Sequence, residues 1–164
     1  MNNLIHSPTG AFHVITALMA LLSGTLILLI RKGTRNHKRW GYIFISSMLM
    51  VNGSAFFLYG LFGTFGPFHG AAVFSMASII IGIHPLFNRR NPRWLRRHLY
   101  GLYFSIFGLY AAFVSEILTR IIHGHFFLLI GLASVSVVSI GGVIITNKSE
   151  EWIRSLGRTG KSIR

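Results

Sequence analysis

The sequence predicts an all-α integral membrane protein, and its composition is the first reason. Hydrophobic residues make up 52% of the 164 residues and charged residues only 12%. In soluble domains roughly one quarter of residues are charged. Five apolar stretches are long enough to cross a hydrocarbon core of about 30 Å, which takes roughly 20 helical residues. Runs such as AVFSMASIIIGI do not alternate in polarity, as the strands of a membrane β-barrel would.

The five expected transmembrane helices cover residues 11–30, 40–62, 70–87, 99–119 and 126–146. A chain in lipid must satisfy its own backbone hydrogen bonds, which favours a helix for each stretch. No Lys or Arg precedes the first stretch, so we expect a retained helix rather than a cleaved signal peptide. We therefore expect one polytopic membrane domain over residues 1–146 and a basic cytoplasmic tail over residues 147–164.

The connections between these stretches predict how the chain is threaded. Five Lys or Arg residues lie in the first connection, five around the third and five in the tail. The second connection has none and the fourth has only Arg120. An alternating five-helix chain thus places fifteen of its sixteen basic residues on one side. By the positive-inside rule that side is cytoplasmic, so we expect an inner-membrane protein with its N-terminus outside.

The net charge of +13 and the pI near 11.6 have the same origin. In a soluble protein they would indicate nucleic acid binding. Here the asymmetry of the loops accounts for them, and we expect no nucleic acid partner. We expect the basic side to attract anionic lipid headgroups. The sequence leaves open a membrane electron-transfer partner or a homo-oligomer.

An internal repeat relates the first two helices to the next two. His13 and His69 each begin an apolar span with an internal glycine, and each span leads to a basic turn ending at His37 or His98. Both hairpins start outside, so the repeat is parallel. We expect a four-helix core made of two parallel hairpins, with the fifth helix packed against it.

The repeat sorts the histidines into two layers, and such layers suit bis-histidine haem. Neutral imidazole is a good axial ligand, and helix-bundle cores hold such cofactors. His13 with His69 would hold one b-type haem near the outside. His84 with His37 or His98 would hold another near the cytoplasm, because His84 lies roughly 22 Å deeper than His69 along its helix. The protein would then be a small membrane redox module. The other interpretation is that these histidines only occupy the two membrane interfaces.

A second cluster is expected at the outer end. Glu116, the only acid within the spans, lies four residues before Arg120, the favourable order for a helical ion pair. The pair could be structural, or Glu116 could accept protons or orient a metal-binding histidine. His13, His69 and His123 are the candidate metal ligands. The alternative function is therefore a non-enzymatic membrane subunit, or a carrier of metal or small ligands.

Other chemistries have no support in the sequence. There is no cysteine, no glycine-rich phosphate loop, no G-x-S-x-G and no H-E-x-x-H. The usual motifs of soluble enzymes are thus missing, and whether the protein is an enzyme stays open.

Five short motifs follow one another along the chain: His13–Gly24, Lys32–Gly41, Phe65–His69, Arg96–His98 and Gly108–Arg120. Their order resembles the DUF2306 family of predicted bacterial membrane proteins of unknown function. The resemblance singles out His13, His37, His69 and His98, with Glu116 and Arg120, and implies no activity. In layout alone the chain is similar to the four-helix, two-haem cytochromes of the b561 type.

Overall fold

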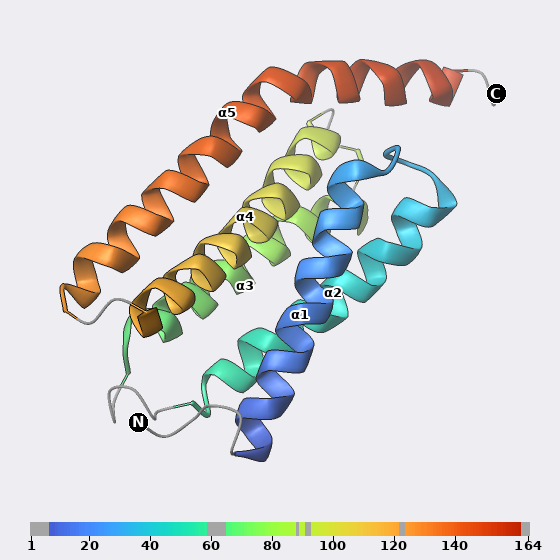
Figure 1. Ribbon diagram of the computed structural model, residues 1–164. Helices are drawn as coiled ribbons and strands as arrows, with labels where there is room; N and C mark the ends of the chain where they lie inside the picture. Colours follow the sequence, from blue (N-terminus) through green and yellow to red (C-terminus); the bar gives the residue numbers. More distant parts are fainter. Residues whose placement is uncertain (1–6, 59–64, 88, 91–92, 122–123, 162–164) are drawn as a thin grey trace. The chain divides into compact units, whose positions relative to one another are not determined.

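The computed structural model describes residues 7–58, 65–87, 89–90, 93–121 and 124–161, with only the backbone for 120, 126, 155 and 157–161. Within these residues the regular structure is entirely helical (Figure 1). The five helices are α1 (Pro8–Leu29), α2 (Arg35–Ala55), α3 (Pro67–Phe87), α4 (Trp94–Ile121) and α5 (Phe126–Lys161). The predicted all-α fold is therefore confirmed.

Four of these helices are long and apolar enough to cross a membrane. They are α1, α3, most of α4 and residues 127–154 of α5. Helix α2 is less clearly a span, because it begins in the basic turn and ends at Ala55. Apolar Phe56, Phe57 and Leu58 continue the stretch beyond the helix.

Side-chain caps explain where the first two helices begin and end. Ser7 Oγ accepts a hydrogen bond from the backbone of Gly10, and Thr34 Oγ accepts one from the backbone of His37. These caps start α1 and α2 three and five residues before the predicted spans. The ammonium group of Lys32 donates to the carbonyls of Ile27 and Leu28, which ends α1 by satisfying free carbonyl groups.

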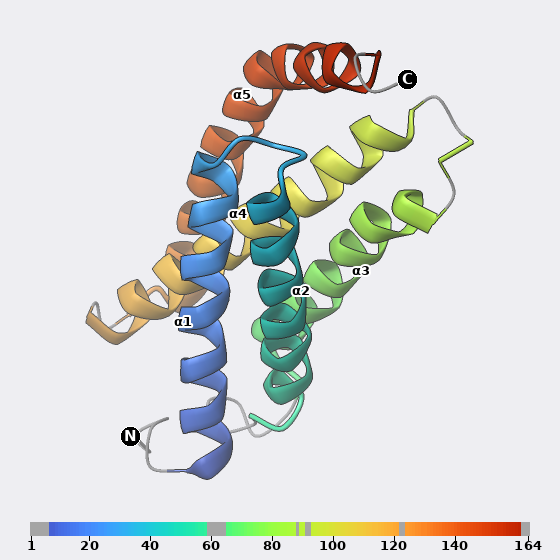
Figure 2. The same ribbon diagram turned by 90° about the vertical axis from the view of Figure 1, so that its right-hand side faces the viewer.

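The chain forms two compact units, Met1–Met76 and Ala77–Arg164. In the first unit α1 and α2 lie side by side (Figures 1 and 2). Small residues of α1, such as Ala20 and Ser23, are buried, and so are Phe44 and Met48 of α2, as expected of two closely packed helices. The boundary between the units falls within α3 rather than between the two hairpins. The four-helix core built from two hairpins stays a prediction.

In the second unit, glycines set the contacts of α4. A Cβ added at Gly101 would lie 2.5 Å from the backbone nitrogen of Gly82, so α3 and α4 touch main chain to main chain. A Cβ at Gly141 of α5 would lie 2.4 Å from the ring of Phe107 on α4. Gly141 therefore lies where α5 packs closely on α4, whereas a Cβ at Gly131 would meet nothing within 4 Å.

The fifth helix is longer than predicted. It runs without a break from Phe126 to Lys161, so the expected span 126–146 and most of the expected tail form one helix. Figures 1 and 2 show that its last third changes direction relative to its first part.

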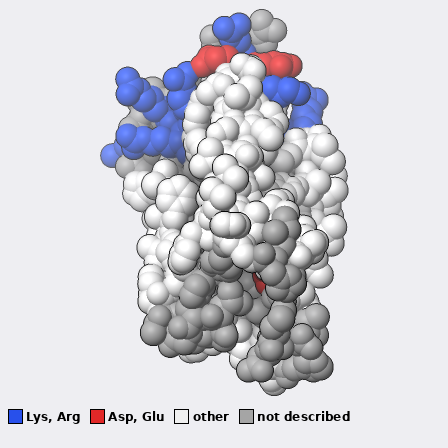
Figure 3. Space-filling view, turned by 60° about the vertical axis from the view of Figure 1, so that its left-hand side comes forward, with Lys and Arg blue, Asp and Glu red and all other residues white. Residues whose placement is uncertain are grey.

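Basic side chains belong to the helix ends in both units. In the first unit they occupy the α1–α2 connection and the start of α2, and in the second they surround the start of α4 and the end of α5. On the face drawn in Figure 3, blue and red cover a limited part of the described surface, and most of the rest is white. This distribution is the one expected of helices whose flanks contact lipid.

Candidate functional site

His13 lies on α1 and is held by α2. Its Nδ1 is 2.9 Å from Ser54 Oγ, and Ser54 Oγ in turn donates to the carbonyl of Val51 at 3.0 Å. Because the hydroxyl hydrogen is used in the second bond, the network assigns the proton of the first bond to His13 Nδ1. The lone pair of His13 is therefore on Nε2.

His69 lies in the first turn of α3 and is 3% exposed. Its Nδ1 accepts a hydrogen bond of 3.1 Å from the backbone N–H of Gly66. This bond assigns the proton of the neutral ring to Nε2, the opposite tautomer to that of His13. The ring centroids of Phe65 and Phe56 lie 5.0 and 6.1 Å from that of His69, so the imidazole is buried among aromatic rings.

The two predicted outer histidines come to the same end of α2. His13 contacts Ser54, and His69 packs near Phe56, two residues further along. One turn back, Asn52 donates a hydrogen bond to Ser75 of α3 at 3.2 Å and is itself 3% exposed. The first unit therefore gathers polar groups from three helices around one helix end. Nε2 carries the lone pair in His13 and the proton in His69.

In the second unit, the ring of His98 makes a hydrogen bond to a neighbouring helix. It is half-buried near the start of α4, and its Nδ1 lies 2.8 Å from the carbonyl oxygen of Gly82 on α3. A carbonyl only accepts, so the proton is on Nδ1 and the lone pair on Nε2. The contact between Gly82 and Gly101, one turn after His98, brings this carbonyl within reach.

The remaining two predicted haem ligands are less clearly placed for that role. His37 is half-buried at the third helical position of α2, in the first unit. His84 is exposed on α3, directly before the buried Pro85, in the second unit. An exposed imidazole is expected of a histidine at the membrane interface, and His84 is exposed. The half-buried His98 is therefore the better candidate for an inner haem ligand.

The predicted outer cluster around Glu116 is only partly described. Glu116 is half-buried on α4. The side chain of Arg120 and all of His123 lie outside the described residues, so the ion pair and the third metal ligand stay predictions. Among the described side chains, no three His, Asp or Glu residues are grouped so as to hold a metal ion.

Comparison with known families gives one match. The family model described as "Predicted membrane protein (DUF2306)" matches residues 10–148, most of the chain. The chain belongs to the DUF2306 family. No curated protein and no solved structure matches it. Family membership supports a membrane location for this DUF2306 protein and leaves the role of its histidines to be argued from geometry.

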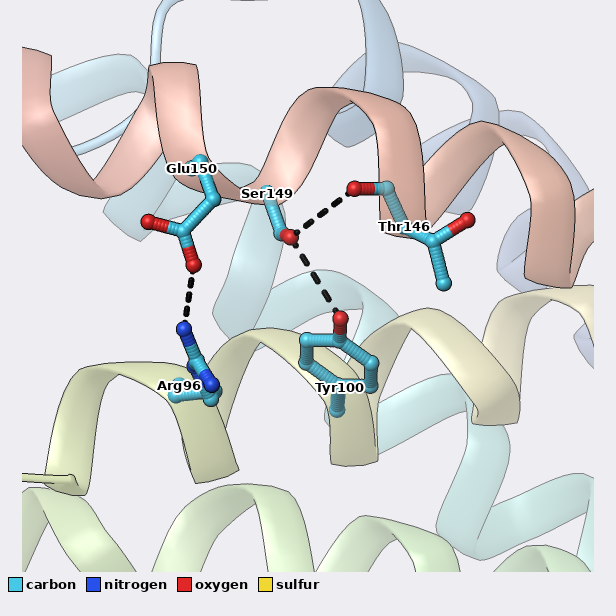
Figure 4. Close-up of polar contacts among 5 residues, drawn as sticks. All are labelled: Arg96, Tyr100, Thr146, Ser149 and Glu150. Carbon is cyan, nitrogen blue, oxygen red and sulfur yellow. Dashed lines mark hydrogen bonds and ion pairs between the residues drawn. The ribbon is translucent and has the colours of Figure 1, made fainter.

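Sequence reasoning missed a group of contacts between α4 and α5 of the DUF2306 protein (Figure 4). Arg96 forms an ion pair with Glu150, and the hydroxyl of Tyr100 lies 3.3 Å from Ser149 Oγ. Ser149 is 2% exposed and also donates to the carbonyl of Thr146. The paired residues of α4 and α5 are about 50 positions apart in the sequence, and no local sequence signal links them.

Proposed function

We propose that this protein is a small membrane redox module that holds b-type haem between layered histidines. The observation that carries the proposal is the hydrogen bond made by Nδ1 of both His13 and His98. Histidines that bind a metal through Nε2 usually donate the Nδ1 proton to a nearby acceptor, which fixes the tautomer and the ring orientation. His13 uses Ser54 for this purpose and His98 uses the carbonyl of Gly82.

Haem would supply one-electron chemistry, and the chain would supply ligands and an apolar surrounding. At the outer layer, His69 is buried among Phe56 and Phe65, and such an aromatic surrounding would suit a histidine that binds haem iron. Its hydrogen bond does not fit, because Nε2 carries the proton while Gly66 donates to Nδ1. Ligation by His69 therefore requires loss of the Gly66 contact and transfer of the ring proton to Nδ1. At the inner layer, the hydrogen bond between His98 and the carbonyl of Gly82 supports the proposal.

We further propose five transmembrane spans in a bacterial inner membrane, with α2 as the second span and the N-terminus outside. The positive-inside rule supports this orientation. The three tryptophans support it as well. Trp40 and Trp94 lie in the first two turns of α2 and α4, and Trp152 lies in the last third of α5, each near basic residues. Tryptophan is enriched at membrane interfaces, so these ends are expected at the cytoplasmic headgroup layer.

The second candidate is a carrier for a small polar ligand. The observation that favours it is the pair of opposite tautomers near the end of α2, with the lone pair of His13 and the proton of His69 on Nε2. Such a pair suits one ligand that both accepts and donates a hydrogen bond. It would involve no redox chemistry.

The two functions differ in what the purified protein contains. Protein from haem-replete membranes should show a Soret band, and the His13→Ala and His98→Ala variants should each weaken it. His125→Ala changes an exposed residue of the α4–α5 connection and should leave the band unchanged. Metal analysis completes the experiment. Iron with porphyrin supports the redox module, whereas protein without porphyrin contradicts it and favours the carrier.

A further inference from the structure

The second unit carries a strongly basic surface around the start of α4 and the bend of α5. Seven cationic side chains are exposed there, against two exposed carboxylates, those of Glu150 and Glu151. The cationic residues are Arg89, Arg90, Arg93, Arg96, Arg97, Lys148 and Arg154. This surface adjoins the ends of helices that are apolar enough to cross a membrane. It is where a headgroup layer would meet the protein.

The position of these charges at the start of a helix is unfavourable without an anion. The N-terminus of a helix carries a partial positive charge, so acidic residues are preferred in the first turn and cations are disfavoured. The first turn of α4 contains Arg96 and Arg97 and no acid. In the first unit α2 repeats the pattern, with Arg35 and Lys38 and no acid. An external anion at the start of α4 would remove this electrostatic conflict.

Two neighbouring arginines show how little of the charge is neutralised internally. Arg96 is paired with Glu150 of α5, although both side chains stay more than half exposed. The Arg97 side chain has no hydrogen-bond, ion-pair or ring partner among the described residues. The α5 carboxylate therefore compensates one arginine of the first turn and leaves the next one to an external partner.

The part of α5 from Lys148 onward is held beside the start of α4, where its charged groups can contact the same external anion. At 1.5 Å per residue, a helix of 36 residues is roughly 54 Å long, well beyond a hydrocarbon core of about 30 Å. Ser149 and Trp152 hold its inner side on Tyr100 and Tyr103 of α4, with ring centroids of Trp152 and Tyr103 6.0 Å apart. Its outer side exposes charged groups such as Lys148 and Arg154.

We propose that the start of α4 and the last third of α5 form a surface that binds the headgroup phosphates of anionic phospholipids, with Arg97 as a principal contact. Arginine suits this role, because its planar guanidinium matches the oxygens of a phosphate. Arg89 stacks on Trp94 with 5.1 Å from its guanidinium carbon to the ring centroid, an amphipathic pair suited to an interface. The inference rests on the membrane location and is independent of haem.

The test compares anionic with zwitterionic lipid on the full chain in detergent. The lipid increment is the rise in the midpoint of thermal unfolding with phosphatidylglycerol minus that with phosphatidylcholine. A ligand that binds only the folded state raises this midpoint, and we expect an increment of about 5 °C that shrinks at high salt. Arg97→Gln should lower the increment to about half.

Two matched variants make the test specific to this surface. Arg96→Gln removes an arginine that is already paired, so the increment should stay near that of the wild type even if the protein itself is less stable. Glu150→Gln releases Arg96 from its pair and should raise the increment. Equal midpoints in the two lipids, or equal losses from Arg96→Gln and Arg97→Gln, would overturn the proposal. Inorganic phosphate that reproduces the full increment would overturn the assignment to lipid.

Discussion

His13 and His98 are oriented by different kinds of acceptor, although both donate from Nδ1. His13 relies on the hydroxyl of Ser54, a side chain that one substitution removes. His98 relies on the main-chain carbonyl of Gly82, which no substitution removes. That carbonyl is kept in reach by the glycine contact between α3 and α4. The outer histidine is therefore sensitive to loss of a polar group, and the inner one to a change in helix packing.

The largest effect should come from adding one methyl group at the glycine contact. In Gly101→Ala the new Cβ would lie within 2.6 Å of main-chain atoms of Gly82, which cannot move aside like a flexible side chain. We expect a loss of about 3 kcal/mol in the free energy of unfolding, together with displacement of the His98 acceptor. Gly108→Ala is the control, because its Cβ meets nothing within 4 Å. Equal denaturation midpoints for the two variants would contradict this packing.

Substitutions of His98 itself separate its structural role from its proposed role as a ligand. His98→Gln keeps an N–H donor for the Gly82 carbonyl, whereas His98→Ala removes it. We expect His98→Ala to cost about 1–2 kcal/mol of stability and His98→Gln less. Both variants should lose haem from the inner layer, as measured by absorption spectra. A His98→Gln protein with a full haem complement would show that His98 acts only in helix packing.

The corresponding change at the outer histidine is Ser54→Ala. It leaves the Nδ1 proton of His13 without this acceptor, and we expect a loss of about 1 kcal/mol in stability. Removal of such a supporting partner typically weakens metal binding 10- to 100-fold. Haem titration should therefore show weaker binding, accompanied by a shift in midpoint potential. Ser23→Ala is the control, because the Ser23 hydroxyl bonds only to carbonyls of its own helix. If both variants bind haem alike, Ser54 does not support a ligand.

The smallest effect is expected where α4 meets α5. Glu150→Gln breaks the ion pair with Arg96, but the two side chains are 51% and 57% exposed and well screened by solvent. We expect at most about 1 kcal/mol of destabilisation in chemical denaturation at low salt, and less at high salt. Glu151→Gln serves as the reference for an exposed acid. A loss of several kcal/mol from Glu150→Gln would mean that the bend of α5 depends on this pair.

The sequence predicted the helices because apolar length is a local property. It located the interior of all five and the basic helix ends. The caps formed by Ser7 and Thr34 extend two helices beyond the apolar stretches, and cap motifs in the sequence could have revealed them. The continuation of α5 to Lys161 was missed, because the hydrophobic pattern stops at Thr146 while helix-forming residues continue.

The acceptors of the histidines could not be predicted in the same way. Ser54 is 41 positions from His13, and Gly82 is 16 positions from His98 on another helix. Which residues meet across two helices depends on their rotation and vertical offset, and hydropathy fixes neither. The tautomer of His69 depends on a single backbone N–H, that of Gly66, which no residue pattern indicates.

The haem content of the purified protein tests the central claim most directly. The account predicts b-type haem at two per chain, measured as the pyridine haemochrome. It predicts about one per chain in His13→Ala and in His98→Ala, since each variant removes one layer. Protein that folds, comes from haem-replete membranes and contains no haem would contradict the account.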